Sequence, residues 1–144
     1  MTGPRRIQLS RKRGWRLPEG AASVGRPSRW GNMFKVGGLI EEPGPWNSPA
    51  IPREGGLPLG FYPGRDITGF DYTYEIRRVR DRADAVALFR AYIRFNDDVW
   101  SLEGIRYALR GKTLACWCPL PAEGEPDICH GAVLLEIANA EESS

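Results

Sequence analysis

The sequence predicts an α/β fold: a single compact domain over residues 1–144, with a small Rossmann-like sheet flanked by helices and a long Gly/Pro-rich loop. Segments of strand-like pattern alternate with segments of helical period along the chain. Apolar residues make up 42% of the sequence, including five Trp, five Tyr and five Phe. A chain of 144 residues can bury about 68–70% of its unfolded surface, enough for a real core.

Three segments have the pattern of strands. Residues 6–10 alternate apolar and polar side chains, and residues 73–76 form a second short extended segment. Residues 113–118 form an apolar run that Pro119 stops, which is typical of a buried strand.

Three segments have the period of helices. Asp81 is a candidate N-cap for a helix over residues 81–96, whose apolar side chains recur on one face. A second helix is predicted over residues 99–109 and ends before Gly111. The last helix is predicted over residues 130–138.

Residues 37–66 contain thirteen Gly or Pro in thirty positions. Such a composition predicts a long irregular loop, which we interpret as a lid that closes over a substrate. The last residues, 140–144, are expected to be frayed.

The net charge of +2 hides a strong asymmetry. Residues 1–35 carry nine Arg or Lys and one acid, whereas the rest of the chain carries eleven bases and seventeen acids. A basic arm suits a phosphate-bearing partner, so we expect a nucleotide or nucleic acid. A basic surface that only meets solvent is the alternative.

The sequence has no stretch of eighteen apolar residues, and its N-terminus lacks the apolar run of a signal peptide. We therefore expect a cytoplasmic protein with no membrane partner and with reduced thiols. Three cysteines cannot all pair within one chain, which argues against a disulfide scaffold.

All three cysteines and the only histidine lie within fifteen residues, as Cys116, Cys118, Cys129 and His130. Extended backbone at the end of the predicted strand would place Cys116 and Cys118 on the same side. Cys129 precedes the last helix, where unpaired amides and the helix dipole are expected to lower its pKa. His130 lies in the first turn, within reach as a base or a ligand.

Three interpretations of this cluster stay open. Cys116, Cys118, Cys129 and His130 could ligate zinc, although the adjacency of the last two makes joint ligation awkward. Alternatively, Cys118 or Cys129 is a catalytic nucleophile with His130 as its base. In the third interpretation Cys116 and Cys118 are small core residues in a buried strand.

A turn rich in Gly, Pro and Arg precedes residue 34. Its Arg26 and Arg29 offer bidentate donors to phosphate, and Trp30 could stack on a base. Ser28 and Asn32 could hydrogen-bond the same ligand. The alternative is a rigid turn with its aromatic residues in the core.

Four blocks together resemble a domain-of-unknown-function family, DUF4326, found in phages and bacteria. The resemblance runs from about Ile7 to Asn139 and implies one compact domain, but no reaction. Its phage members imply a context of DNA or nucleotide metabolism, and a host cytoplasm for a phage-encoded chain. The blocks are Val24 to Asn32 (VGRPSRWGN), Leu109 to Lys112 (LRGK), Leu114 to Cys118 (LACWC), and Cys129 with His130.

These observations favour a small enzyme of transferase or hydrolase type that acts on a nucleotide, nucleobase or nucleic acid. Arg26 and Arg29 would hold phosphate, while Cys118, Cys129 and His130 would form the reacting centre. Two alternatives remain: a non-catalytic, zinc-stabilised nucleic-acid-binding module, and a phage protein that inhibits a host factor. We expect the arginine turn and the cysteine cluster to lie together in the fold.

Overall fold

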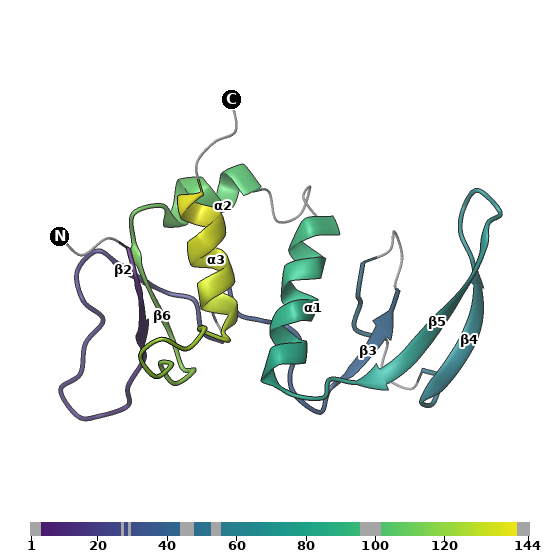
Figure 1. Cartoon of the computed structure of the whole chain (residues 1–144), viewed down its shortest axis with the longest axis horizontal. Coiled ribbons are helices and arrows are strands. Elements are labelled where there is room, and N and C mark those ends of the chain that lie inside the picture. Colours follow the sequence, from purple (N-terminus) through teal and green to yellow (C-terminus); the bar gives the residue numbers. More distant parts are fainter. Residues whose placement is uncertain are drawn as a thin grey trace. The chain divides into compact units, whose positions relative to one another are not determined.

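The structure is a computed structural model that describes residues 4–26, 28, 30–43, 48–52, 56–95 and 102–140. The chain divides into two compact units. Unit 1 comprises residues 1–32 and 98–144, and unit 2 comprises residues 33–97. Each unit has its own three-stranded sheet and at least one helix, so the predicted α/β class is confirmed (Figure 1).

The sheet of unit 1 is parallel. Its central strand β6 (Thr113–Cys116) pairs on one side with β1 (Arg6–Gln8) and on the other with β2 (Ala21–Ser23). Strands β1 and β6 confirm the sequence prediction, whereas the short β2 has no sequence pattern that announces it. Three strands are too few to establish the Rossmann-like arrangement.

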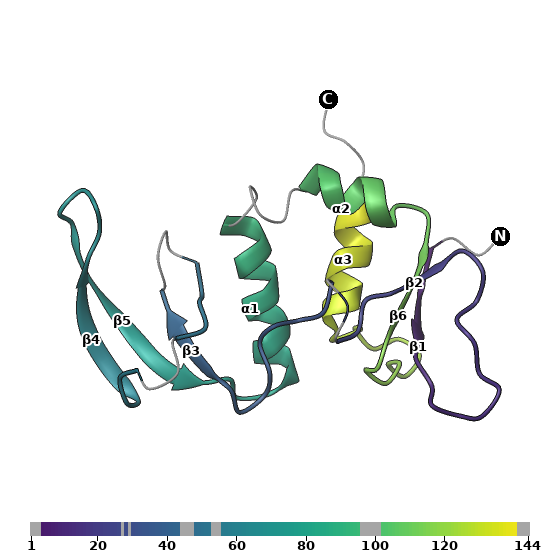
Figure 2. The ribbon, with the colours of Figure 1, turned by 180° about the vertical axis from the view of Figure 1, so that it is seen from behind.

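Two helices accompany this sheet. Helix α2 (Leu102–Leu109) packs on α3 (His130–Asn139), which in turn contacts β6 and β1 (Figure 2). Both helices confirm the prediction. The apolar core of unit 1 is formed by Val24, Ile105, Leu109, Leu114, Ala115, Val133, Leu134 and Ala138.

Unit 2 contains an antiparallel sheet in the order β3-β5-β4 and one long helix. The helix α1 (Arg82–Phe95) begins after Asp81, whose carboxylate accepts a hydrogen bond from the Asp84 amide at 2.8 Å, as the N-cap prediction requires. The strands are β3 (Leu39–Glu42), β4 (Gly60–Arg65) and β5 (Asp71–Arg78), and the core includes Phe34, Ile40, Ile76, Val79, Leu88, Phe89 and Ile93.

The irregular loop predicted over residues 37–66 is wrong for residues 39–42 and 60–65, which form β3 and β4. Strand β4 lies at an edge of the sheet and pairs with β5 alone. Pro63 has no amide hydrogen, but an edge strand has no second neighbouring strand to which that hydrogen bond would be lost, so proline is tolerated there. Gly64 is required by packing, since a Cβ there would lie 2.6 Å from the Tyr72 ring. Glycine and proline therefore belong to the sheet here.

The remaining expectations concern membrane-spanning segments and the ends of two predicted elements. In the described residues, no helix combines the length and the apolarity that crossing a bilayer requires. The tail predicted to fray, apart from Ala140, lies outside the described residues. The same holds for the start of the predicted second helix, residues 99–101.

Candidate metal centre

The three cysteines and the histidine come from the end of β6 and the start of α3. Cys116 is the last residue of β6, and Cys118 follows two positions later. Cys129 is the N-cap of α3, with extended backbone (φ −152°, ψ 143°), and its Sγ accepts a hydrogen bond from the Gly131 amide at 3.3 Å. Because the backbone changes from extended to helical at this point, Cys129 and His130 turn their side chains toward the same place.

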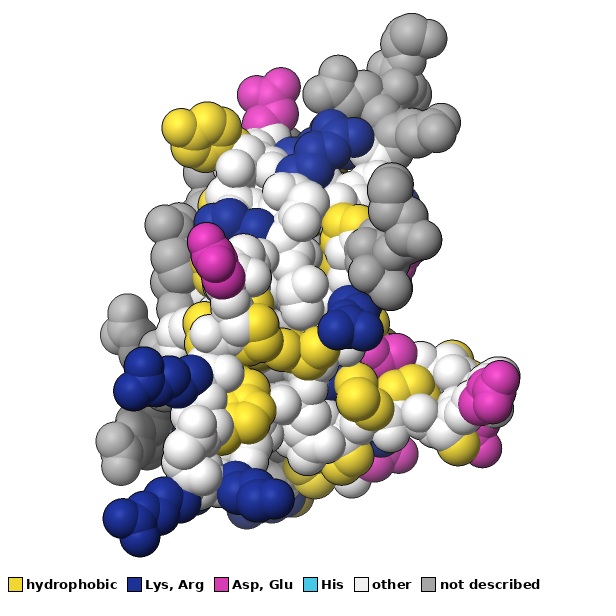
Figure 3. Space-filling view, turned by 90° about the vertical axis from the view of Figure 1, so that its left-hand side faces the viewer, with side chains coloured by type: hydrophobic (Ala, Val, Ile, Leu, Met, Phe, Trp, Pro, Cys, Tyr) yellow, Lys and Arg dark blue, Asp and Glu magenta, His cyan; other side chains and the backbone are white. Residues whose placement is uncertain are grey.

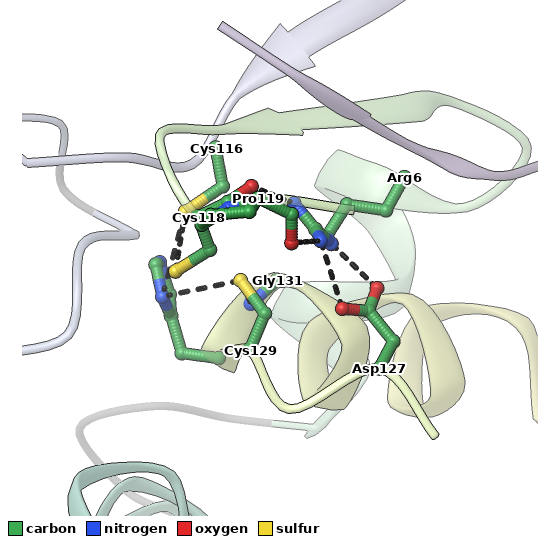
Figure 4. Close-up of polar contacts among 8 residues, drawn as sticks. Arg6, Cys116, Cys118, Pro119, Asp127, Cys129 and Gly131 are labelled. Atoms are coloured by element: carbon green, nitrogen blue, oxygen red, sulfur yellow. Dashed lines mark hydrogen bonds and ion pairs between the residues drawn. The ribbon is translucent and has the colours of Figure 1, made fainter. Parts of the chain in front are cut away.

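The three sulfur atoms form one cluster (Figure 4). The Sγ atoms of Cys116, Cys118 and Cys129 all lie within 4.8 Å of one another. Those of Cys116 and Cys118 are 3.8 Å apart, which confirms that the two side chains share a side. Two sulfurs bound to one tetrahedral zinc at about 2.3 Å would be about 3.8 Å apart, which is the separation of the Cys116 and Cys118 sulfurs.

His130 turns one ring nitrogen toward this cluster. Its Nε2 lies 2.5 Å from the carbonyl oxygen of Val24, which can only accept, so Nε2 carries the hydrogen. In the neutral ring Nδ1 then bears a lone pair, and it lies 3.8 Å from Cys116 Sγ and 3.9 Å from Cys129 Sγ. The adjacent Cys129 and His130 therefore place Sγ and Nδ1 3.9 Å apart on the same side of the chain.

The environment of the imidazole favours its neutral form. His130 is only 6% exposed, and burial lowers its pKa. A ring that is neutral, fixed by a backbone carbonyl and directed at thiols has the arrangement that metal-bound histidines adopt in proteins. In the absence of a metal, the same ring would be a weak base beside buried sulfurs.

The thiols titrate as a group. Hydrogen bonds from the Cys116 and Cys129 thiols lower the pKa of Cys118. The pKa of Cys129 is raised by its contacts with Cys116 and Cys118 and by burial, and the Gly131 amide only partly offsets this. The prediction that the helix terminus lowers the Cys129 pKa is therefore wrong. Neighbouring sulfurs, which the sequence could not place, have the larger effect.

Exposure also separates the sulfurs. Cys116 and Cys129 are buried, with 3% and 0% of their surface exposed, whereas Cys118 is half-buried. Of the two candidate nucleophiles, Cys129 is sealed from solvent. Cys118 is the more accessible of the two, whereas the Nδ1 atom of His130 lies 3.8 Å from the Cys116 sulfur and 3.9 Å from the Cys129 sulfur.

An arginine that the sequence did not single out holds the segment after β6. The Arg6 guanidinium donates hydrogen bonds to the Cys118 carbonyl at 2.9 Å, to the Pro119 carbonyl at 2.8 Å and to both carboxylate oxygens of Asp127 (Figure 4). Its side chain is 2% exposed. Arg6 thus fixes both ends of the loop that connects the first two sulfurs to the third.

Arg6 is also coupled electrostatically to the sulfurs. Burial lowers the pKa of its guanidinium, but the hydrogen bond to Asp127 and the charges of Cys129, Asp127 and Cys116 outweigh burial and raise it. A zinc ion with three thiolates carries a net charge of about −1. The permanent positive charge of Arg6 would compensate it.

Replacing Arg6 with methionine should destabilise the protein by about 3 kcal/mol, because Asp127 and two carbonyls lose their partner in a buried position. Urea unfolding of the native chain measures this change. Arg65→Met is the matched control: its ion pair with Asp71 is exposed, with 69% and 73% of the side chains accessible, and its loss should cost less than about 1 kcal/mol. Equal shifts in the two variants would contradict a clamping role for Arg6.

The predicted phosphate-binding turn adjoins the cluster. Its amide hydrogen bonds run from Ser28 to the Gly25 carbonyl at 2.8 Å and from Gly31 to the Ser28 carbonyl at 3.0 Å. The Ser28 hydroxyl accepts from the Trp30 amide at 3.3 Å, so it stabilises the turn itself. Arg26 is exposed, and its charge contributes to lowering the pKa of His130.

The other predicted ligand-binding residues of this turn differ in accessibility. Trp30 is half-buried and Asn32 is 3% exposed, so Asn32 is better placed to support the turn than to meet a ligand. Arg29 lies outside the described residues. Of the five residues predicted to bind phosphate or base, Arg26 is the cation whose exposure suits that role.

Two contacts join the turn to the cysteine blocks. Val24, just before the turn, accepts the hydrogen bond from His130. Gly25 lies against Trp117: a Cβ at this glycine would be 2.9 Å from the indole Cδ1. The glycine that begins the turn is therefore required by the tryptophan between the first two cysteines. These contacts place Val24 and Gly25, at the start of the turn, beside His130 and Trp117, while a common cleft for Arg26, Arg29 and the cysteines stays a prediction.

Comparison with known proteins gives one match. The family described as "Domain of unknown function (DUF4326)" matches residues 7–140, in agreement with the resemblance noted from the sequence. No curated protein matches the chain, and no solved structure does.

Proposed function

Since this chain belongs to the DUF4326 family, whose description assigns no activity, we propose a function from the site itself: unit 1 is a zinc-stabilised module that binds a nucleotide or nucleic acid. The observation that carries the proposal is the set of four donor atoms from Cys116, Cys118, Cys129 and His130. Three sulfurs lie within 4.8 Å of one another, and the Nδ1 atom of His130 lies 3.8 Å and 3.9 Å from two of them.

The donor set fits zinc in type, number and support. Three thiolates and one neutral imidazole are a common tetrahedral set for structural zinc. The nitrogen opposite the ligating one donates to the Val24 carbonyl, which fixes the ring as outer hydrogen bonds do in metal sites. The ion would bind β6, the loop after it and the start of α3 to one another.

Burial favours a structural role over thiol catalysis. Cys116, Cys129 and His130 are each at most 6% exposed, so a substrate would have to open the fold to reach them. A closed four-ligand site needs no such access. This is why we prefer the binding module to the enzyme as the primary function.

The partner follows from the cations of unit 1. Arg11, Lys12, Arg13, Arg16 and Arg26 are all exposed, and phosphate groups are the partners that such clusters most often serve. The charge asymmetry of the sequence supports the same class of ligand, since the first 35 residues carry nine bases and one acid.

Fluorescence anisotropy with a labelled oligonucleotide tests this function. The zinc-loaded protein should bind, and the logarithm of its affinity should fall linearly with the logarithm of the salt concentration, because phosphate contacts release counterions. An inert protein of similar charge provides the background. If the zinc-loaded protein binds neither an oligonucleotide nor a nucleoside triphosphate above that background, the proposal is wrong.

A second candidate function is favoured by the half-buried position of Cys118. In it the protein is a transferase or hydrolase of nucleotides, with Cys118 as nucleophile and His130 as proton carrier. Alkylation by iodoacetamide, read by mass spectrometry, distinguishes the two. A zinc-bound sulfur should be protected until a chelator is added, whereas a catalytic thiol should be modified at once in the native protein.

A further inference from the structure

The tryptophan between the first two cysteines is exposed and holds an arginine. Trp117 has 41% of its surface accessible, although it lies between residues that contribute to the cluster. The Arg11 guanidinium carbon lies 4.9 Å from the centre of its ring, a cation–π contact. The indole also lies against Gly25 and is therefore held in position.

The Arg11 guanidinium keeps its hydrogen-bonding capacity for a ligand. In the part of the chain that the structure describes, no carboxylate forms an ion pair with Arg11, Lys12, Arg13, Arg16 or Arg26. Other arginines are neutralised, such as Arg77 by Asp84 and Glu42. These five exposed cations of unit 1, of which Arg11 lies over the Trp117 ring, thus have no carboxylate partner among the described residues, and a polyanion is the partner that they fit.

A space-filling view supports this picture. Figure 3 faces the side of unit 1 on which the loop between β1 and β2 lies in Figure 1, and dark-blue Lys and Arg side chains stand beside yellow apolar ones on it. The cations of that loop are Arg11, Lys12, Arg13 and Arg16. A cation held against an aromatic ring, as Arg11 is held against Trp117, is typical of surfaces that bind single strands.

We propose that Arg11 and Trp117 form the centre of a binding surface for single-stranded nucleic acid, with Lys12, Arg13 and Arg26 around it. This inference rests on the proposed function and names its substrate class. The guanidinium, oriented by the indole, binds a backbone phosphate, and the exposed part of the indole stacks on a base. A duplex hides the faces of its bases, so it can use only the cations.

Two substitutions separate the parts of this surface. Trp117→Ala removes the stacking group and the support of Arg11, so the affinity for a single strand should fall at least about fivefold. Arg11→Gln removes one phosphate contact, so the salt dependence of binding should decrease by roughly 0.7 in slope on a single strand. Both side chains lie outside the core, and zinc content and thermal unfolding show that each variant keeps its fold.

The matched control is Lys112→Gln. Lys112 is exposed and belongs to the same unit, but it precedes β6, whereas Trp117 follows that strand. The variant loses one positive charge, as Arg11→Gln does. It should bind the oligonucleotide with unchanged affinity, within about twofold, and with an unchanged salt slope.

The experiment is a fluorescence anisotropy titration of fluorescein-labelled dT12 with the zinc-loaded protein and its three variants, with rU12 and a 12-base-pair duplex as further ligands. The result expected is weaker binding by the Trp117 and Arg11 variants alone, and a smaller effect of Trp117→Ala on the duplex. Comparable affinities of dT12 and rU12 indicate that either sugar is accepted.

Three other outcomes are distinguishable. Native binding to dT12 that Trp117→Ala and Lys112→Gln leave equally unchanged overturns this surface, while the proposed function stands. A Trp117 effect that is as large on the duplex as on dT12 overturns the preference for single strands. If the native protein binds none of the three nucleic acids, the inference falls together with the nucleic-acid part of the proposed function.

Discussion

Chelation of zinc should unfold unit 1 of this protein. All four proposed ligands belong to unit 1, and they connect β6 to α3, whose apolar side chains form much of its core. Zinc binding at such sites contributes about 10–16 kcal/mol at neutral pH, which is comparable to the usual stability of a whole domain. Thermal unfolding followed by circular dichroism, with and without EDTA, measures this loss of stability. We expect it to exceed the loss caused by the Arg6→Met substitution.

Hydrogen exchange of the native chain localises this effect. After chelation, amide protection should be lost in β6 and α3, and zinc, but not magnesium, should restore it. Helix α1 serves as an internal reference because it carries none of the ligands. Unchanged protection of α3 in EDTA, with zinc shown to be absent, would mean that packing alone holds these elements together.

The second large effect is expected at His130. His130→Ala removes one of four ligands, and the zinc affinity should fall more than about 100-fold, since loss of a hydrogen bond outside the ligand set already costs 10- to 100-fold. His130→Cys should restore most of the affinity, because a Cys side chain at the start of α3 offers sulfur at nearly the place where Nδ1 lies. Competition with a chromogenic chelator measures both.

This pair of variants distinguishes two roles of His130, that of a zinc ligand and that of a core residue. If His130 served only to hydrogen-bond the Val24 carbonyl, His130→Cys would lose that bond as fully as His130→Ala does. The two variants would then bind zinc equally. Equal affinities, whether both high or both low, therefore contradict ligation by Nδ1.

The sequence located the cluster because thiol and imidazole are rare and chemically distinct residues. It could not decide between metal, catalysis and core, since that choice depends on contacts made far along the chain. The tautomer of His130 is set by Val24, 106 positions away. The order of the thiol pKa values depends on the distances between the sulfur atoms. A rule based only on the position of Cys129 at a helix terminus does not include those distances.

Arg6 illustrates a second limit. Alternation in residues 6–10 correctly predicted a strand, but the buried side chain of β1 is the arginine, while Ile7 is half-buried. Its partners are Asp127 and the carbonyls of Cys118 and Pro119, all more than 100 positions away. Read locally, Arg6 was one more cation of a basic arm.

The fold was predictable where apolar period was strong, as in α1, α2 and α3. It was not predictable over residues 37–66, because glycine and proline are read as loop signals. The edge position of β4 and the space that the Tyr72 ring needs at Gly64 make these residues suitable for a strand. Both facts are properties of the assembled sheet.

The central claim is that one zinc ion is held by Cys116, Cys118, Cys129 and His130 of the same chain. X-ray absorption at the zinc edge, on protein purified without chelator and with its metal content determined, tests it most directly. We expect one zinc per chain with three sulfurs at about 2.3 Å and one nitrogen at about 2.0 Å. Protein that contains no zinc and takes up none, or a zinc surrounded mainly by oxygen, would contradict it.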